Sequence, residues 1–402
     1  MKHVSRILST YSADTFGVCS ALYELGGMIV IHDPSGCNST YTTHDEPRWF
    51  AEPSQIFISA LTEQDAILGN DSRLIADITA AAKALQPRFI CLIPSQIAHM
   101  IATDCRAICR ILEKKTGIPA FTLPTNSMHY YERGIFFALQ KLAELACQAL
   151  PEAAAPRRLP EAKWLSEEEL HKLRQGKGRA LRVNLLGATP LDFSLNGSIL
   201  SLRRWLEARG CHVASCWAMG SALDAILASH EADLDLVLSY GGLGAARVLH
   251  ERAGIPYRIG IPFPHCASAR GDAACPPEGP AYIIGETVFA ESLSRALEAA
   301  IGLPFTAIVP METDDELLLP GTLRLTDEDE LSPVLREAAL IIADPLYQPI
   351  CPAGAAFLSL PHIAFSGRLY EKTIPNLIEE EAFTDFVQKV QKNLGKLPQN
   401  RV

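Results

Sequence analysis

Two cysteines, Cys19 and Cys37, have the residue type and spacing that a shared metal site requires. Thiolates are the ligands that iron–sulfur clusters and soft metal ions prefer. Residues 19–25 predict a helix and residues 28–32 a returning strand, with a glycine pair between them. These elements span about 10 Å and about 16 Å in opposite directions, so both thiols are expected at one end of an α/β layer.

The composition is that of a large globular chain. It has 402 residues, 48% of them hydrophobic, and a formal net charge of −10. This size allows two or three domains, and the acidic balance argues against nucleic acid as a partner. We expect no membrane span and a cytoplasmic location, because no apolar run is long enough and the first residues lack a signal-peptide pattern. Eleven cysteines, an odd number, do not indicate a disulfide framework in such a protein, which favours thiolate ligands.

Strand and helix patterns alternate along the chain. Residues 88–93 form an apolar run typical of a strand buried on both faces of a parallel sheet, and a helical pattern follows. The predicted fold is α/β, with three doubly wound, Rossmann-like parallel-sheet domains around a central cleft. The last domain is expected to contain a late strand at residues 362–365. The predicted units are a cluster-binding domain (1–150), a linker (151–180), a second domain (181–275) and a third domain with a C-terminal helix (276–402).

Several segments resemble nitrogenase component 1 and its relatives, the large cluster-bearing subunits of nitrogenase-like reductases. The resemblance implies three doubly wound domains, a related partner subunit, an iron–sulfur cluster at the subunit interface and an ATP-dependent iron protein as electron donor. The clearest segments are GVCSALYELGG (17–27), IHDPSGC (31–37) and LTEQDAILG (61–69); weaker ones are VNLLG (183–187), ADLDLVLS (232–239) and AGIPY (253–257).

The sequence departs from the family pattern at two ligand positions. Gln96 stands where the family usually has a third cluster cysteine, and glutamine is a poor iron ligand. Ser239 stands where true nitrogenases have a cofactor-binding cysteine, and no histidine matches the second cofactor-binding position. The resemblance therefore does not imply dinitrogen reduction on a molybdenum cofactor.

Two cysteines at the family's cluster-ligand positions suggest a cluster shared between subunits. Cys19 and Cys37 from each of two copies would supply the four thiolates of a [4Fe–4S] cluster, which predicts a homodimer. A related large subunit could instead supply the missing ligands in a heteromer, and core packing is the alternative for both cysteines. His32, Gly36 and Gln96 are expected to surround the ligands without binding the metal.

Other candidate residues fall near the predicted cleft. Ser239 and Cys351 follow strands, while His265, Cys266 and Cys275 lie in a proline-rich loop that could bind a metal or serve only as a connector. Cys105 and Cys109 are four residues apart on a predicted helix, where core packing is the expected role. The GGLG segment (241–244) lacks the lysine of a P-loop and predicts close backbone approach to a ligand or a neighbouring domain.

These observations favour an oxidoreductase component. The chain is predicted to carry an iron–sulfur cluster, to accept electrons from an ATP-dependent iron protein and to reduce a substrate in the interdomain cleft. One alternative is a non-catalytic cluster scaffold or partner subunit. Another is a cytoplasmic protein that binds a small molecule or a metal chelate.

Overall fold

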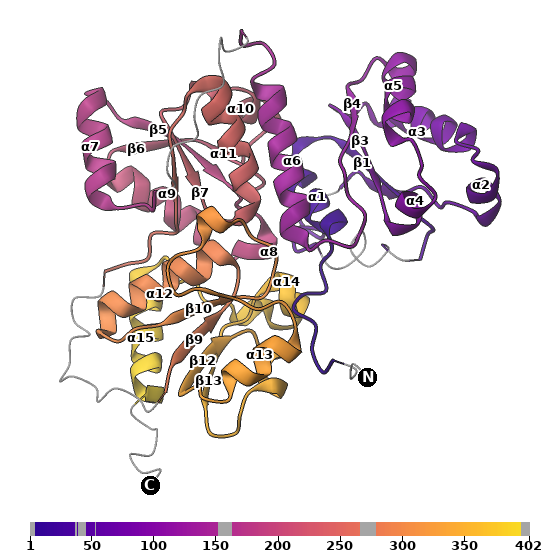
Figure 1. The fold of residues 1–402 in the computed structure, drawn as a ribbon. Helices are drawn as coiled ribbons and strands as arrows, with labels where there is room; N and C mark the ends of the chain where they lie inside the picture. The colour runs from indigo at the N-terminus through magenta and orange to yellow at the C-terminus, as the bar shows by residue number, and fades with distance from the viewer. Residues whose placement is uncertain are drawn as a thin grey trace.

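The computed structural model describes residues 5–36, 38, 46–52, 54–151, 163–265 and 279–394. These residues form three parallel sheets, each flanked by helices, which confirms the predicted α/β fold with three parallel-sheet domains (Figure 1). The sheets fall within the predicted ranges, whereas the boundaries between the domains stay a prediction. In the described part of the chain, no helix is both long and apolar enough to cross a bilayer.

The first sheet has four parallel strands in the order β2-β1-β3-β4. Alternate residues of β1 and β3 face two separate apolar clusters, one with α1 and the other with α3 and α5. Burial on both faces explains the continuous apolar runs of these strands. The elements are α1 (Asp14–Leu22), η1 (Tyr23–Leu25), β1 (Met28–His32), β2 (Ile56–Ile58), α2 (Glu63–Leu68), α3 (Ser72–Leu85), β3 (Ile90–Pro94), α4 (Gln96–Met100), α5 (Cys105–Thr116) and β4 (Ala120–Thr122).

The second sheet has four parallel strands in the order β6-β5-β7-β8. A short segment at Trp164 pairs in parallel with the outer strand, where the Leu165 amide donates to the Ile259 carbonyl at 2.7 Å. The elements are α7 (Glu167–Lys177), β5 (Leu181–Leu186), α8 (Pro190–Phe193), α9 (Ser198–Ala208), β6 (Cys211–Cys216), α10 (Leu223–Leu227), η3 (Ser229–Glu231), β7 (Leu234–Val237), α11 (Tyr240–Ala253) and β8 (Tyr257–Ile259).

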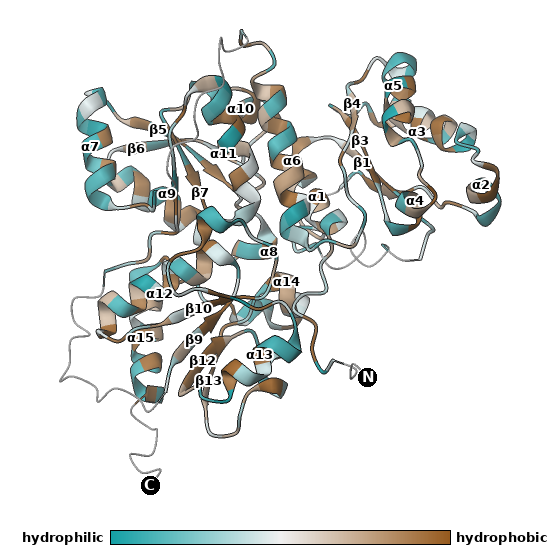
Figure 2. Ribbon diagram, in the orientation of Figure 1, coloured by the Kyte–Doolittle hydropathy of each residue, from teal (hydrophilic) through white to brown (hydrophobic). Residues whose placement is uncertain are grey.

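The third sheet has five parallel strands in the order β11-β10-β9-β12-β13, and its central strands are strongly apolar (Figure 2). The expected strand at residues 362–365 is wrong, because β13 ends earlier and these residues begin a short helix capped by the His362 ring. The elements are β9 (Ala281–Ile284), α12 (Thr287–Ile301), β10 (Thr306–Val309), η5 (Asp315–Leu317), β11 (Leu323–Arg324), α13 (Glu328–Leu335), β12 (Leu340–Ala343), η6 (Pro345–Ile350), β13 (Ala356–Ser359), α14 (Ile363–Ser366), η7 (Gly367–Thr373) and α15 (Glu380–Leu394).

Helix α6 (Tyr131–Ala146) lies between the first and second domains and packs closely against both (Figure 1). A Cβ at Gly17 of α1 would lie 1.8 Å from the Tyr131 carbonyl oxygen, and one at Gly134 would lie 1.8 Å from the Asp14 carbonyl oxygen. Neither contact tolerates a side chain, so the glycines bring the two helix backbones together.

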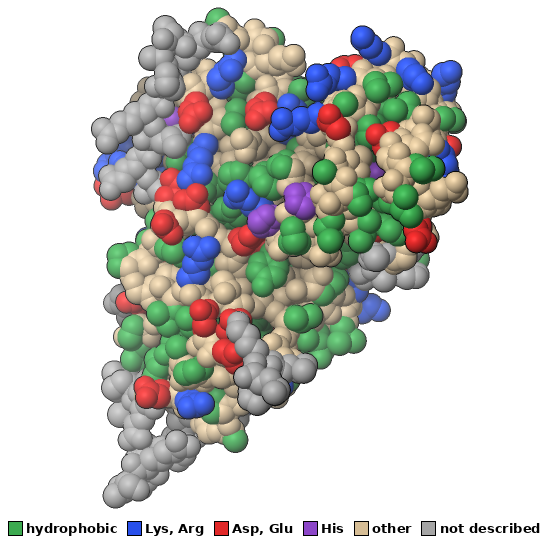
Figure 3. Space-filling model, turned by 45° about the vertical axis from the view of Figure 1, so that its right-hand side comes forward, with side chains coloured by type: hydrophobic (Ala, Val, Ile, Leu, Met, Phe, Trp, Pro, Cys, Tyr) green, Lys and Arg blue, Asp and Glu red, His purple; other side chains and the backbone are tan. Residues whose placement is uncertain are grey.

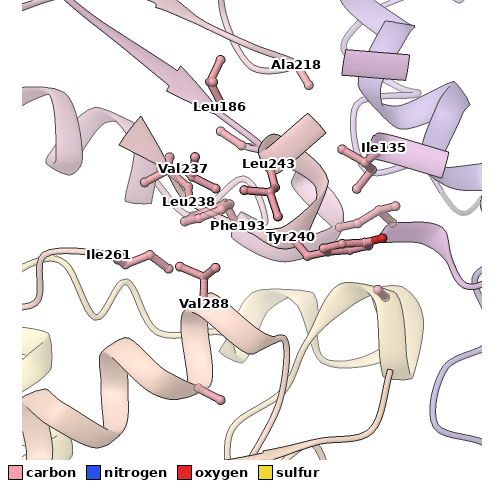
Figure 4. Close-up of a cluster of buried hydrophobic side chains, with 14 of the residues drawn as sticks. Ile135, Leu186, Phe193, Ala218, Val237, Leu238, Tyr240, Leu243, Ile261 and Val288 are labelled. Atoms are coloured by element: carbon pink, nitrogen blue, oxygen red, sulfur yellow. The ribbon is translucent and has the colours of Figure 1, made fainter. Parts of the chain in front are cut away.

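The GGLG segment begins α11 and packs against the other side of α6. A Cβ at Gly241 would lie 2.4 Å from a methyl carbon of Ile135, and one at Gly244 would lie 2.9 Å from the Phe136 ring. The close-up shows Ile135 beside Tyr240 and Leu243 of α11 (Figure 4). The sequence left two roles open for this segment, close approach to a ligand or to a neighbouring domain. Its contacts with α6 are those of close approach to a neighbouring domain.

A series of hydrogen-bonded polar side chains is buried within the second domain. The Asn184 amide donates to Asp235 Oδ1 at 2.7 Å and accepts from Ser215 Oγ at 2.7 Å. Asp235 Oδ2 has no hydrogen-bond partner among the described residues. Burial raises the pKa of Asp235 to about 8, although the Asn184 bond opposes this shift. Asp235 therefore favours the protonated form in the folded protein.

The Asp235 carboxyl predicts a pH-dependent stability. In the unfolded chain its pKa is about 3.9, so its contribution to stability is complete below that pH and is lost as the pH rises through about 8. In chemical denaturation, Asp235→Asn should remove a slope of up to about 1.4 kcal/mol per pH unit between pH 5 and pH 7. Asp77→Asn, at an exposed position, is the control. Equal slopes in wild type and Asp235→Asn would contradict this account.

The helix crossing gives a second prediction. Gly17→Ala and Gly134→Ala should each lower the free energy of unfolding by about 3 kcal/mol or more, because backbone atoms block the added methyl group. Gly176→Ala in α7 is the matched control, since no atom lies within 4 Å of its Cβ position. That change should be neutral or stabilise by about 0.5–1 kcal/mol. Denaturant titration measures all three, and an unaltered midpoint for Gly17→Ala would refute the close crossing.

Candidate functional site

The loops after β1 and β3 meet at the carboxyl edge of the first sheet. These neighbouring strands flank the point where the strand order changes direction, which is the usual ligand position in doubly wound sheets. The Ser95 amide donates to the His32 carbonyl at 3.2 Å and joins the two loops. Gln96 is exposed at the first position of α4, which follows β3 at this edge.

Asp33 holds the loop after β1 in place. Its side chain is 1% exposed and accepts hydrogen bonds from Asn38 Nδ2 at 2.8 Å and from Ser95 Oγ. Asn38 also accepts from Thr15 Oγ1 at 3.3 Å. Thr15 lies one helical turn before Cys19 on α1, so the residue after Cys37 contacts the helix that carries Cys19. Cys37 itself lies outside the described residues.

Cys19 is fully buried on α1. Burial raises the pKa of its thiol, and the nearby Glu46 carboxylate raises it further. A thiol in such surroundings stays protonated unless a cation compensates the thiolate charge. An iron–sulfur cluster would supply that compensation, whereas burial and Glu46, the described causes of the shift, both oppose the thiolate.

Arg48 anchors the segment that follows the cysteine loop. Its side chain is 4% exposed and forms an ion pair with Glu46 at 2.6 Å and another with Glu24 at 2.8 Å. It also donates to the carbonyls of Ser20 on α1 and Ala218 in the second domain, at 2.9 and 2.8 Å. Arg48 therefore fixes this segment against α1 and links it to the second domain.

His32 and Gly36 have different surroundings. His32 is buried, its Nδ1 lies 2.8 Å from Ser59 Oγ, and its ring lines a cavity of about 170 Å³ with Asp65 and Asp104. Burial lowers the pKa of His32, although neighbouring aspartates oppose this. Gly36 is exposed. The predicted supporting roles of both residues, and of Gln96, stay a prediction.

The same edge of the first domain exposes large apolar side chains. Ile67 and Leu68 of α2 are 75% and 67% exposed, and Met100 of α4 is 71% exposed. Hydrophobic side chains lie among basic and acidic ones over this domain, at the right of Figure 3. Several exposed apolar side chains gathered at one edge are typical of a protein-binding surface.

A second polar site lies where the three domains meet. Tyr131 of α6 donates its hydroxyl to Asp192 Oδ1 of α8 at 2.5 Å. His362, at the start of α14, places its Nε2 3.5 Å from the same oxygen. Asp192 therefore joins groups from the first and third domains. Phe193, the neighbour of Asp192 in sequence, belongs to an apolar cluster that includes Tyr240 and Val288 (Figure 4).

Two further acids are buried at this junction. Glu286 Oε1 accepts from the Tyr240 amide at 2.8 Å and Oε2 accepts from the Phe289 amide at 2.9 Å. Burial and the Asp192 charge nevertheless raise the pKa of Glu286 to about 8. Glu132 is 1% exposed, and neither of its oxygens has a hydrogen-bond partner in the described structure. Burial raises its pKa well above the ordinary value, and neighbouring acids raise it further.

The other predicted cleft residues lie in different surroundings. Ser239 is buried and donates to the Gly187 carbonyl at 2.8 Å. Cys351 is half-buried, donates to the Tyr347 carbonyl at 3.2 Å, and burial raises its pKa to about 11. His265 is 79% exposed at the rim of a cavity of about 740 Å³ between β8 and α12. Cys266 and Cys275 lie outside the described residues.

The sequence patterns did not identify the acidic residues or the histidine of the junction. Glu286 and His362 lie in the loops after strands β9 and β13, two and three residues beyond the strand ends, so the rule that ligand-binding residues follow parallel strands could have found them. Glu132 and Asp192 begin helices, where an acidic residue is commonplace, and their burial depends on contacts between domains. No local pattern signals such burial.

The fold and these polar edges define a multidomain, doubly wound α/β protein with polar groups at the carboxyl ends of its strands. The family described as "Nitrogenase component 1 type Oxidoreductase" matches residues 15–270. The chain belongs to this family, which confirms the resemblance seen in its sequence.

The names of the chain's relatives state different functions. The chain is 26% identical over 233 residues to the nitrogenase iron-molybdenum cofactor biosynthesis protein NifE of Clostridium pasteurianum, covering 57% of this chain and 44% of NifE. It is 27% identical over 239 residues to a light-independent protochlorophyllide reductase subunit from Prosthecochloris aestuarii, covering 58% and 39%. The chain thus spans less than half the length of these curated relatives.

A solved structure has the same fold over nearly the whole chain. "Nitrogenase Cp1 at pH 6.5" aligns with a TM-score of 0.67 over 98% of this chain and 94% of that chain, at 13% identity. At this identity the likeness is one of fold alone.

Asp33 gives a prediction for this site. Asp33→Ala should lower the free energy of unfolding by about 1–3 kcal/mol, because the buried Ser95 hydroxyl and Asn38 amide lose their acceptor. Asp33→Asn keeps one acceptor oxygen and should cost less. Asp77→Ala, on the exposed surface of α3, serves as the control. Denaturant titration measures the effect, and equal stability of Asp33→Ala and the control would show that this network is unimportant.

Proposed function

We propose that this chain is an iron–sulfur cluster-carrying component of a nitrogenase-like reductase. The observation that carries the proposal is the contact between Asn38 and Thr15, which ties the loop of Cys37 to the helix of Cys19. Membership of the oxidoreductase family supports it. A bound cluster would accept and release single electrons, and Cys19 and Cys37 would hold it. The buried surroundings and backbone hydrogen bonds near these residues would tune its potential.

The cluster is proposed to be a [4Fe–4S] cluster at a subunit interface. Two cysteines per chain are half of the four thiolates that such a cluster needs, so a second subunit completes the set. The exposed Ile67, Leu68 and Met100 at the same edge support a partner there. A homodimer is the simplest assembly, and a related large subunit is the alternative partner.

An ATP-dependent iron protein is the proposed electron donor. The sequence has no P-loop lysine motif, so nucleotide hydrolysis would occur on the partner. The proposed substrate position is the junction of the three domains, where acids that burial keeps protonated could hydrogen-bond a substrate and move protons to it. Ser239 offers no thiolate and is bonded to the Gly187 carbonyl, which argues against a molybdenum nitrogenase. The proposed location is the cytoplasm.

A non-catalytic scaffold is the second candidate. The likeness to NifE, a cofactor biosynthesis protein by name, favours it, whereas the likeness to a protochlorophyllide reductase favours a reductase. Reduction of a substrate by the purified chain with an iron protein would separate the two. A third candidate, a protein that binds a small molecule or a metal chelate, would need only a cavity such as the one beside His265.

The cluster hypothesis predicts the iron content of variants. Wild type produced anaerobically with cluster-assembly proteins should contain about four irons per dimer and show the spectrum of an iron–sulfur cluster. Cys37→Ala should lose most of the iron and shift toward monomer in solution mass measurements. Cys147→Ala, at the end of α6, is the control and should retain both. Full iron content in Cys37→Ala, or none in wild type, would overturn the assignment.

A further inference from the structure

No described Lys or Arg side chain pairs with Glu132 or Glu286 at the three-domain junction, and a ring nitrogen of His362 lies 3.5 Å from Asp192. Glu132 belongs to the helix between the first and second domains, Asp192 to the second and Glu286 to the third. Burial and the nearby charges of Asp192, Glu286 and Glu312 all disfavour ionisation of Glu132. Neither Glu132 oxygen has a hydrogen-bond partner in the described structure, and the Glu132 backbone amide opposes the raised pKa only in part, so the charged form is poorly supported.

The basic groups near these acids are engaged elsewhere. The Arg133 guanidinium lies 5.1 and 4.8 Å from the ring centres of Phe136 and Phe137 and donates to the Tyr240 hydroxyl. His129 Nδ1 lies 2.6 Å from Glu312.

His362 is the third basic group. Its Nδ1 accepts from the Ala364 amide at 3.2 Å, so the neutral ring carries its proton on Nε2, which lies 3.5 Å from Asp192. The titratable and charged groups near these acids are Tyr130, Tyr131, Arg133, Tyr240, His129, Glu312, Tyr347 and His362.

A metal ion does not balance these acids in the observed arrangement. Among the described residues, no group of three or more His, Cys, Asp or Glu side chains has the geometry to hold one. The adjoining cavity, lined by Asp192 and His362, measures about 40 Å³, which accommodates only a few water molecules. Protonation neutralises a buried carboxyl group that has neither a metal ion nor a basic partner.

We propose that Glu132 and Glu286, which are buried beside Asp192, form a proton-controlled latch between the three domains. With the acids protonated, the third domain closes on the other two. When the acids ionise, their mutual repulsion and their need for water open the junction and admit solvent and ligands. This latch acts whether or not the chain carries a cluster.

The direction of the pH response follows from burial. An exposed glutamate has a pKa of about 4.3, whereas burial and neighbouring acids raise the pKa of Glu132 well above this and that of Glu286 to about 8. Closure is therefore complete below about pH 4 and is lost as the pH rises through these higher values. The opening equilibrium should increase on the order of tenfold per pH unit for each acid that ionises.

Apolar contacts confine the opening to the junction. Phe263, which follows the second sheet, packs against Phe289 and Phe383 of the third domain with ring centres 5.8 Å apart. These contacts do not depend on pH, so they oppose separation of the domains while the acids favour it. The expected response is greater exposure of α8, α14 and the start of α12, with the sheets still folded.

Hydrogen exchange of the purified full-length chain tests the latch. After correction for the intrinsic exchange rates, opening of α8 and α14 in wild type should increase about tenfold or more between pH 6 and pH 8. Glu132→Gln should reduce this increase at least severalfold, because its amide cannot ionise. Asp235→Asn is the matched control: it removes a buried acid of the second sheet and should leave the junction's response unchanged.

Two outcomes would overturn the proposal: pH-independent protection of α8 and α14 in wild type, or the same pH response in Glu132→Gln as in wild type. Glu286→Gln is a second variant in case Glu132→Gln does not fold. It keeps an oxygen for one backbone amide and should likewise weaken the response. Binding of iron is not needed in any arm, so failure of the latch and failure of the cluster hypothesis are distinguishable.

Discussion

The close packing of α6 is the constraint on which the rest of the structure depends. Gly17 and Gly134 let α1 and α6 touch through their backbones, and Gly241 and Gly244 let α11 approach α6 from the other side. The helix therefore belongs to two domains at once. Since its first turn carries Tyr131 and Glu132, the same packing that joins the domains also fixes two groups of the junction.

This arrangement connects the two candidate sites. The carbonyl of Tyr131 faces Gly17, and Cys19 lies two residues further along the same helix, so both sites rest on one helix crossing. Both sites contain a buried acidic group whose negative charge is unfavourable unless a positive charge offsets it. The buried thiol of Cys19 needs a metal cation before it can ionise, and the buried carboxyl of Glu132 needs a proton to remain neutral. Both groups are stable as neutral species in a low-dielectric interior.

The sequence predicted the features that a local residue pattern determines. The strand at residues 28–32 and the apolar run at 88–93 follow from burial on both faces, and the meeting of the loops after β1 and β3 follows from parallel topology. It failed at residues 362–365, where the apolar residues after His362 suit a strand but the His362 ring caps a helix instead. It also missed Glu132 and Asp192, because contacts between domains bury them and no spacing within one segment records those contacts.

The size of the junction limits what the closed protein can do there. A cavity of about 40 Å³ beside Asp192 and His362 is far smaller than the roughly 300–1,000 Å³ of ordinary ligand pockets. Any substrate reduced at this junction must therefore enter a more open state than the one described. Ionised acids would favour that state, and binding of a ligand that neutralises them would close it again. Closure would then expel water and strengthen each remaining polar contact, as reduction in a protected site requires.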